Sequence, residues 1–229
     1  MPALPRALSA PLVATGTAVV RAASRVRGER AIHARGRTLT GRLSVPGGLG
    51  TGAPLLDAPG SYDVLVRVSR SVGLPLPLPD VLGLAVRVLD AHGPGRHQDL
   101  LLDATRPEPV LRRLPWLGRD HLGVLHGSLL PYDVAGRRVL LGARPLPGQG
   151  AATLDQLPDE LAYELLVATP HGPWTPWGTV RTDGELPAPQ GRQTRFNPWT
   201  TGGGIVPAGP WQTWRRRAYD ASHVADDER

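Results

Sequence analysis

The chain has 229 residues, of which 41% are hydrophobic and 20% are charged. This composition excludes a fully disordered chain and fits one domain with its own core. Its 28 glycines and 25 prolines favour short elements joined by turns over a helical bundle. Cysteine is absent, which excludes disulfides, thiolate metal ligands and cysteine nucleophiles.

The chain carries a formal net charge of +6, and all 26 of its basic residues are arginines. Arginine-only usage together with abundant Ala, Gly, Leu, Pro and Val is typical of a GC-rich coding sequence. Because a guanidinium keeps its proton, the high isoelectric point follows partly from that usage. Residues 215–217 form the one dense basic run. We therefore expect no specific nucleic-acid partner. A protein that binds nucleic acid is kept as an alternative interpretation of the basic charge.

The first 29 residues predict a helix with a basic tail that docks onto the rest of the chain. No stretch reaches the roughly 18 apolar residues of a transmembrane helix, so we expect no transmembrane segment. The mildly apolar residues 7–20 leave a weak export signal open as the alternative. Otherwise the sequence favours a cytoplasmic protein.

Hydrophobic alternation predicts a series of short strands separated by turn signals. The predicted strands are residues 37–45, 62–68, 82–89, 96–102, 138–143, 161–169 and 178–182. Residues 46–60 read as a loop, 91–95 as a hairpin turn, 107–114 as a short helix and 211–224 as a last helix. This pattern predicts an α+β chain built on a closed antiparallel β-barrel with flanking helices.

One domain accounts for the whole chain in this interpretation. Residues 1–29 are its N-terminal helical segment, residues 30–183 its barrel, and residues 184–229 a loop followed by the last helix. The seven histidines are scattered, without the spacing of a metal site. His121 and His126 are five residues apart, and we expect them on different sides of a helix. A Gly-x-Ser-x-Gly nucleophile elbow is also absent.

A set of short motifs stands out along the chain. Arg30-Ala-Ile-His33-Ala-Arg-Gly36 leads into the first predicted strand, and Arg67-Val-Ser69 ends the second. The next strands read Asp80-Val-Leu-Gly83-Leu-Ala85-Val-Arg87 and Gln98-Asp99-Leu-Leu, and the last helix contains Arg215-x-Arg217-Ala-Tyr219-x-x-Ser222. In this order, the motifs resemble those of the haem catalase superfamily, most closely its short, catalase-related peroxidases.

The resemblance implies haem b as cofactor, with Tyr219 as the axial ligand of the iron. A free tyrosine has a pKa near 10, and an arginine four residues earlier on the same helix face favours its phenolate. Arg215 has this spacing, although an arginine stacked on a surface tyrosine would have it too. Arg30 and Arg67 would pair with the haem propionates, or they are ordinary solvated charges.

By the same resemblance, His33 is the residue that would move the proton of a peroxide between its two oxygens. A neutral imidazole with a pKa near 6.5 can both accept and return a proton. Ser69 would hold the imidazole in the required orientation. The alternative is a partly exposed histidine at a strand edge beside Arg35.

The sequence also departs from the family pattern. Asp103 stands where the family has an asparagine that helps to position peroxide, and Phe196 is the sole phenylalanine. An ionised carboxylate donates no hydrogen bond. We therefore expect a haem-dependent peroxidase-like oxidoreductase that oxidises a small organic substrate, with weak or absent peroxide dismutation. The alternative is a non-catalytic barrel that binds haem or another small ligand. We expect a monomer or homodimer.

Overall fold

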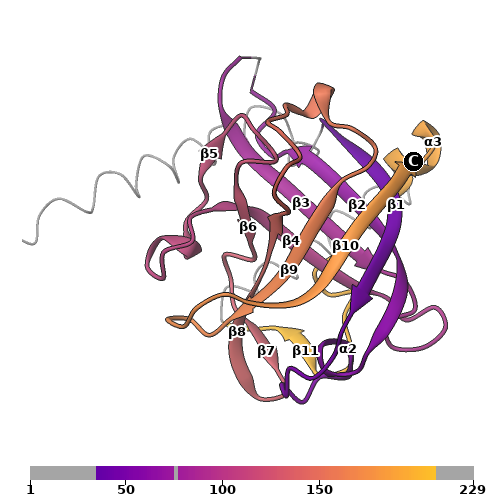
Figure 1. Cartoon of the computed structure of the whole chain (residues 1–229), viewed down its shortest axis with the longest axis vertical. Coiled ribbons are helices and arrows are strands. Elements are labelled where there is room, and N and C mark those ends of the chain that lie inside the picture. The colour runs from indigo at the N-terminus through magenta and orange to yellow at the C-terminus, as the bar shows by residue number, and fades with distance from the viewer. Residues whose placement is uncertain (1–34, 75–76, 210–229) are drawn as a thin grey trace, which may run out of the picture.

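The computed structural model describes residues 35–74 and 77–209, and its main feature is a closed β-barrel (Figure 1). Neighbouring strands run antiparallel in the order β8, β6, β4, β3, β2, β1, β10, β9, and pairing of β9 with β8 closes the ring. The strands are β1 (Arg35–Val45), β2 (Gly60–Arg70), β3 (Asp80–Val88), β4 (Gln98–Thr105), β6 (Leu125–Gly127), β8 (Arg137–Pro145), β9 (Ala162–Ala168) and β10 (Thr175–Glu185). The predicted closed antiparallel barrel is confirmed.

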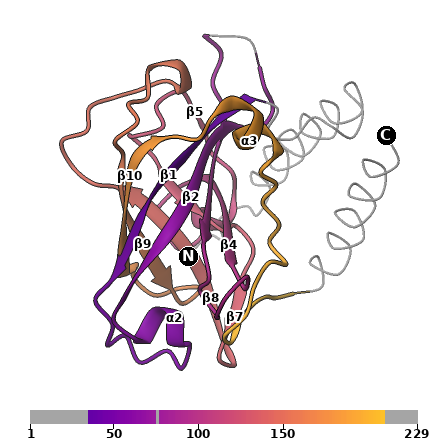
Figure 2. The ribbon, with the colours of Figure 1, turned by 90° about the vertical axis from the view of Figure 1, so that its right-hand side faces the viewer.

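Smaller elements decorate the two ends of the barrel. β7 (Tyr132–Val134) and β11 (Ile205–Pro207) extend the sheet from β8, and β5 (Leu117–Gly118) pairs with the start of β3. The short helix α2 (Pro54–Asp57) lies at the end of the barrel near β7 and β11, whereas α3 (Ala188–Gln193) lies at the opposite end (Figures 1 and 2). Two 3₁₀ turns, η1 (Leu111–Arg113) and η2 (Leu154–Gln156), complete the described elements.

Alternate residues of each strand fill the barrel interior. Leu39, Val66, Val86 and Leu100 stand in register across four adjacent strands, and each is at most 1% exposed. Such alternation is what a strand with one buried face requires. Because the interior is packed with aliphatic side chains, a ligand as large as a porphyrin has room only outside the barrel wall.

The seam between β1 and β10 depends on Gly41. The register of the two strands shifts between Thr40 and Gly41, as at a β-bulge. A Cβ atom at residue 41 would lie 2.2 Å from the carbonyl oxygen of Arg181 and 2.8 Å from Cα of Thr182. The glycine therefore permits the close backbone approach that this part of the seam needs.

Several expectations about local structure need correction. Residues 107–114 hold only the 3₁₀ turn η1, and the expected loop 46–60 contains α2. His121 and His126 do not share a helix: His126 lies in β6 and His121 in the loop before it. The helices expected over residues 1–29 and 211–224 fall outside the described residues. Within the described part of the chain, no helix has the length and apolarity needed to cross a membrane.

Candidate functional site

A row of small and polar residues crosses the outer face of the barrel. Gly36, Ser69, Gly83 and Asp103 stand in register on β1, β2, β3 and β4. Ser69 follows the buried core residue Val68 and therefore points to the opposite, outer side of the sheet. Since Gly83 has no side chain, Ser69 and Asp103 flank a flat strip of backbone.

The neighbouring row on the same face contains Arg67 next to Ala85. Arg67 Nη1 donates a hydrogen bond to Thr38 Oγ1 at 3.2 Å, and Thr38 in turn donates to the carbonyl of Gly191 in α3 at 3.1 Å. Burial lowers the pKa of the Arg67 guanidinium below its usual 12.5. A partly desolvated guanidinium pairs more strongly with a carboxylate than a fully hydrated one does.

Asp103 is half-buried beside the flat strip. Ser71 Oγ donates a hydrogen bond to Asp103 Oδ1 at 3.4 Å. The carboxylate lies in register between Gly83 and Gly127 of β6, so glycine backbone borders it on both neighbouring strands. An ionised aspartate here accepts hydrogen bonds and repels a second anion, in contrast to an amide, which also donates.

The buried carboxylate of Asp80 has a structural role. Asp80 is 0% exposed, and its oxygens accept hydrogen bonds from the backbone N–H groups of Val72 at 2.9 Å and Leu74 at 3.0 Å. Arg70 Nε also lies 3.4 Å from Asp80 Oδ2. Asp80 therefore fixes the turn that follows Ser69 and Arg70, including the position of Ser71.

Arg87 and Asp99 hold a distant segment against the outer face. Arg87 Nε and Nη2 donate to the two oxygens of Asp99, each at 2.7 Å, and the N–H of Asn197 donates to Asp99 Oδ2 at 2.8 Å. Arg87 Nη2 also donates to the carbonyl of Arg195 at 2.5 Å. Figure 2 shows the chain after α3 running down beside β4. The motif residues Arg87 and Asp99 thus attach residues 195–197 to the barrel wall.

The seven site residues expected from the sequence divide into two groups. Arg67, Ser69 and Asp103 share one outer face of the barrel. The other four, Arg30, His33, Arg215 and Tyr219, lie outside the described residues. Among residues 35–74 and 77–209, no cluster of three histidine or carboxylate side chains could hold a metal ion.

A second polar group lies inside the barrel, and no sequence pattern predicted a role for it. His126 and Tyr163 pack edge to face with ring centres 6.3 Å apart, and the four ring nitrogens of His121 and His126 have no hydrogen-bond partner within the described part of the chain. Burial lowers the pKa of His126 to about 3 and that of His121 to about 4. Burial also raises the pKa of the Tyr163 phenol. These side chains are neutral core residues, and no sequence motif marks them.

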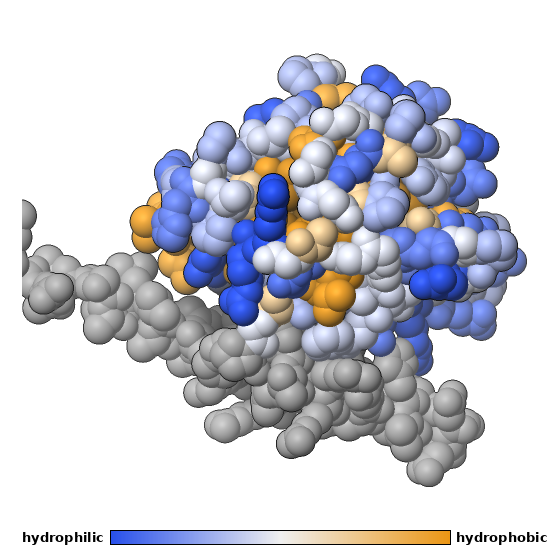
Figure 3. Space-filling view, turned by 90° about the horizontal axis from the view of Figure 1, so that it is seen from below, coloured by the Kyte–Doolittle hydropathy of each residue, from blue (hydrophilic) through white to orange (hydrophobic). Residues whose placement is uncertain are grey.

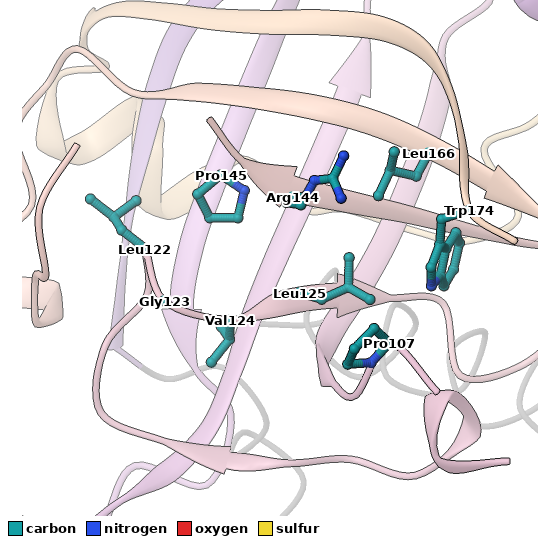
Figure 4. A pocket seen from close by; sticks show the side chains of 9 residues that line it. All are labelled: Pro107, Leu122, Gly123, Val124, Leu125, Arg144, Pro145, Leu166 and Trp174. Atoms are coloured by element: carbon teal, nitrogen blue, oxygen red, sulfur yellow. The ribbon is translucent and has the colours of Figure 1, made fainter. Parts of the chain in front are cut away.

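A groove of about 340 Å³ lies on the outer surface where β6 and β8 meet (Figure 4). Leu125, Leu166 and Trp174 give it an apolar lining, with Arg144 at its edge. A Cβ atom at Gly142 would lie 2.9 Å from the indole ring of Trp174, so this glycine lets the ring rest on the strand. Arg67, Ser69 and Asp103 do not line this groove, which is therefore separate from the flat strip.

Comparison with known proteins identifies the fold. No protein-family model and no curated protein sequence matches the chain. A solved bacterial catalase matches it with a TM-score of 0.59 and 14% identity, over 90% of this chain and 58% of the catalase. A fungal catalase matches with a TM-score of 0.57 and 13% identity, over 91% of this chain and 61% of the catalase. The chain thus spans about three fifths of the length of these catalases. Its barrel has the catalase-like fold.

Proposed function

We propose that the protein is a haem-dependent, peroxidase-like oxidoreductase that uses peroxide to oxidise a small organic substrate. One observation carries the proposal: on a barrel of catalase-like fold, Arg67, Ser69 and Asp103 stand together on one outer face. Arg67 and Ser69 belong to a motif at which the sequence resembles the catalases, and Asp103 occupies the position of a family asparagine. Because one fold can host many functions, the proposed function rests on the chemistry of this face.

The outer face is compatible with a flat, carboxylate-bearing cofactor such as haem b. Gly83 and Ala85 present almost no side chain, and the packed interior excludes the alternative position inside the barrel. Arg67 would pair with one propionate and Arg30 with the other. Tyr219, with Arg215 favouring its phenolate, would be the axial ligand. When bound, haem would supply the redox-active iron at which peroxide is reduced.

Two residues of the chain would manage the proton of the peroxide. His33 would accept the proton from one oxygen and return it to the other, which a neutral imidazole can do near neutral pH. Ser69, only 3% exposed, would keep the imidazole oriented. A fixed orientation matters because proton transfer requires hydrogen-bond distance to each oxygen in turn.

Asp103 would limit the reaction of a second peroxide molecule. Its carboxylate accepts hydrogen bonds and repels the negative charge that develops on a peroxide oxygen. Dismutation requires two peroxide molecules to react in succession at the same place. An organic electron donor reacts without that requirement, so peroxidase chemistry is favoured over dismutation.

A non-catalytic barrel that binds haem or another small ligand is the second candidate. The observation that favours it is the same half-buried carboxylate of Asp103 on the flat strip. In this case Arg67 would still recognise a carboxylate of the ligand, but His33 would have no proton to move. The two candidates therefore differ in whether His33 affects the rate of peroxide consumption.

The test is peroxide-dependent oxidation of a phenolic dye by haem-loaded protein, compared with the same amount of free haem. We expect His33→Gln to lower the rate by about 100-fold or more at unchanged haem content. The exposed His171 supplies the control, and His171→Gln should leave the rate unchanged. A His33→Gln variant as fast as the parent protein would contradict the enzymatic proposal and favour the binding barrel.

A further inference from the structure

The described surface gathers its exposed apolar side chains in one place. Among residues 35–74 and 77–209, seven large hydrophobic residues are exposed, and five of them lie between residues 110 and 117. A sixth, Leu78, is close because β5 pairs with the start of β3. We call this set the apolar patch: Leu78, Val110, Leu111, Leu114, Trp116 and Leu117, with exposures from 39% for Leu111 to 80% for Val110. Grouped exposure of this kind marks an interaction site.

The segment that carries the apolar patch is held in place by hydrogen bonds. Thr105 Oγ1 lies 3.2 Å and 2.9 Å from the carbonyl oxygens of Leu111 and Leu114, and the N–H of Trp116 donates to Ala104 at 2.7 Å. The buried Arg112 donates to the carbonyls of Pro107 and Gly172. Because these bonds fix the backbone, the apolar side chains are presented outward by a preformed surface.

The patch also projects from the barrel. In Figure 1 the chain around η1 leaves the barrel on the left of the view. Figure 3 shows that hydrophilic residues cover most of the lower end of the molecule, with hydrophobic side chains in small groups, one of them at the same left edge. A projecting position lets the patch contact a flat surface without a clash from the rest of the barrel.

Arginines surround the apolar patch. Arg106, Arg113 and Arg119 are exposed, and the Arg106 guanidinium lies 4.3 Å from the centre of the Trp116 ring. Glu108 is the single acidic residue between positions 106 and 119, and its carboxylate is 3.9 Å from Arg106. Within residues 35–74 and 77–209, no carboxylate forms an ion pair with Arg113 or Arg119. These exposed arginines therefore give the apolar patch a positively charged rim.

We propose that the apolar patch docks on an anionic phospholipid bilayer. Trp116 and the leucines would enter the interface between headgroups and acyl chains, where amphipathic aromatic rings are favoured. Arg106, Arg113 and Arg119 would contact the lipid phosphates, and their aliphatic stems would extend along the apolar surface. Peripheral membrane binding combines the burial of apolar side chains with the attraction of basic side chains to anionic lipids. The apolar patch supplies the first contribution and its arginines supply the second.

The charge of the rim disfavours a second copy of the chain as the occupant. In a symmetric dimer through this patch, the same surface meets itself, so Arg113 and Arg119 would face their own copies or each other. Like charges brought together in this way oppose association. A bilayer rich in anionic lipid supplies the opposite charge over the whole patch. This inference goes beyond the proposed function and does not depend on haem binding.

The experiment is co-sedimentation of the full-length protein with two sets of large vesicles. One set contains equal amounts of phosphatidylglycerol and phosphatidylcholine, and the other contains phosphatidylcholine alone. We expect saturable binding to the anionic vesicles, at least about tenfold weaker binding to the neutral ones, and release in 1 M NaCl. Absence of the parent protein from the anionic vesicle pellet would overturn the proposal.

Variants separate the two contributions from general loss of folding. Leu114→Ser/Leu117→Ser removes apolar side chains, and Arg113→Gln/Arg119→Gln removes charge; each should weaken binding about tenfold or more. The control is Val206→Ser, because Val206 is equally an exposed apolar residue at 45% but lies in β11 outside the patch. Binding unchanged in both double variants would contradict the proposal. A parent dimer in sedimentation equilibrium that dissociates in Leu114→Ser/Leu117→Ser would assign the patch to self-association instead.

Discussion

Ser69 and Asp103 lie on either side of Gly83 on the outer face of the barrel, each in register with it. The pairing places a buried hydroxyl and a half-buried carboxylate along the edges of one flat strip. This relationship joins two residues that are more than thirty positions apart in the sequence. The proposed site therefore has a hydrogen-bond acceptor, the Asp103 carboxylate, at the position where a hydrogen-bond-donating amide would favour peroxide dismutation.

The first prediction concerns that carboxylate. Asp103→Asn replaces an acceptor-only group by an amide that also donates, and it removes the negative charge next to the peroxide. We expect oxygen release from hydrogen peroxide by the haem-loaded protein to rise by about tenfold or more. An oxygen electrode measures this directly. Asp63→Asn is the control, because Asp63 is a surface residue on β2. A decrease or no change in Asp103→Asn would contradict the role given to the carboxylate.

The second prediction concerns the barrel seam. In Gly41→Ala the new Cβ would lie 2.2 Å from the Arg181 carbonyl oxygen, so the backbone of β1 or β10 must shift. We expect a loss of about 3 kcal/mol in the free energy of unfolding. Gly184→Ala is a matched control on the same strand pair, because its Cβ would meet only Thr40 Oγ1 at 3.7 Å. Urea denaturation measures the free energy of unfolding of both variants. Equal losses of stability in Gly41→Ala and Gly184→Ala would contradict the prediction, because the seam would then tolerate a methyl group at residue 41.

The third prediction concerns acid stability. His121 and His126 are neutral in the folded barrel because burial lowers their pKa values from 6.5 to about 4 and about 3. Arg70 lowers the pKa of His121 further, whereas Asp120 and Asp80 oppose the shift. Between pH 6.5 and about 4, the unfolded chain therefore binds more protons than the folded chain. Stability should fall as the pH decreases through this range, by about 1.4 kcal/mol per histidine for each pH unit.

Chemical denaturation at pH 7.5 and pH 5.5 measures this effect. The His126→Leu variant should have a smaller decrease in unfolding free energy between the two pH values, even if its stability at pH 7.5 differs. His171→Gln is the matched control, because it replaces an exposed histidine in place of a buried one. A pH dependence that is the same in His126→Leu and in the parent protein would show that His126 does not titrate as proposed.

The fourth prediction concerns the ion pair that attaches residues 195–197 to the barrel. Asp99 is 0% exposed, so Arg87→Met leaves a buried carboxylate without its guanidinium partner. We expect a loss of about 3–5 kcal/mol in stability. Arg87→Met/Asp99→Leu removes both charges and should recover part of that loss. The paired denaturation curves form the test, and a double variant less stable than Arg87→Met would contradict the argument from the unpaired charge.

The barrel strands with strong alternation were predictable from the sequence. Val64, Val66 and Val68 are buried and alternate with the half-buried Leu65 and Arg67, and β2 follows that pattern. Three-residue strands such as β6 (Leu125–Gly127) and β7 (Tyr132–Val134) are too short to show a period. Pairing with β4 and β8 holds β6 in the sheet, so its strand conformation depends on tertiary contacts that a local pattern cannot reveal.

The site was predictable only in part, for a related reason. Alternation within β2 assigns Arg67 and Ser69 to the same face, but the register between β2, β3 and β4 determines that Asp103 joins them. That register is a property of the assembled sheet. The resemblance to catalases suggested the grouping, whereas the attachment of Asn197 to Asp99 had no signal in the sequence. The buried pair His126 and Tyr163 likewise meets only because β6 and β9 both flank β8 in the assembled sheet.

Titration of the protein with ferric haem, followed by absorption spectroscopy, tests the proposed haem site. We expect saturable binding of one haem per chain, with the Soret band and charge-transfer bands of a high-spin ferric tyrosinate. Tyr219→Phe should abolish or change this spectrum, and Tyr62→Phe, a change near the opposite end of β2 from Ser69, should preserve it. The absence of saturable haem binding would refute the proposed haem-dependent function. A Tyr219→Phe spectrum identical to that of the parent protein would refute the assigned axial ligand.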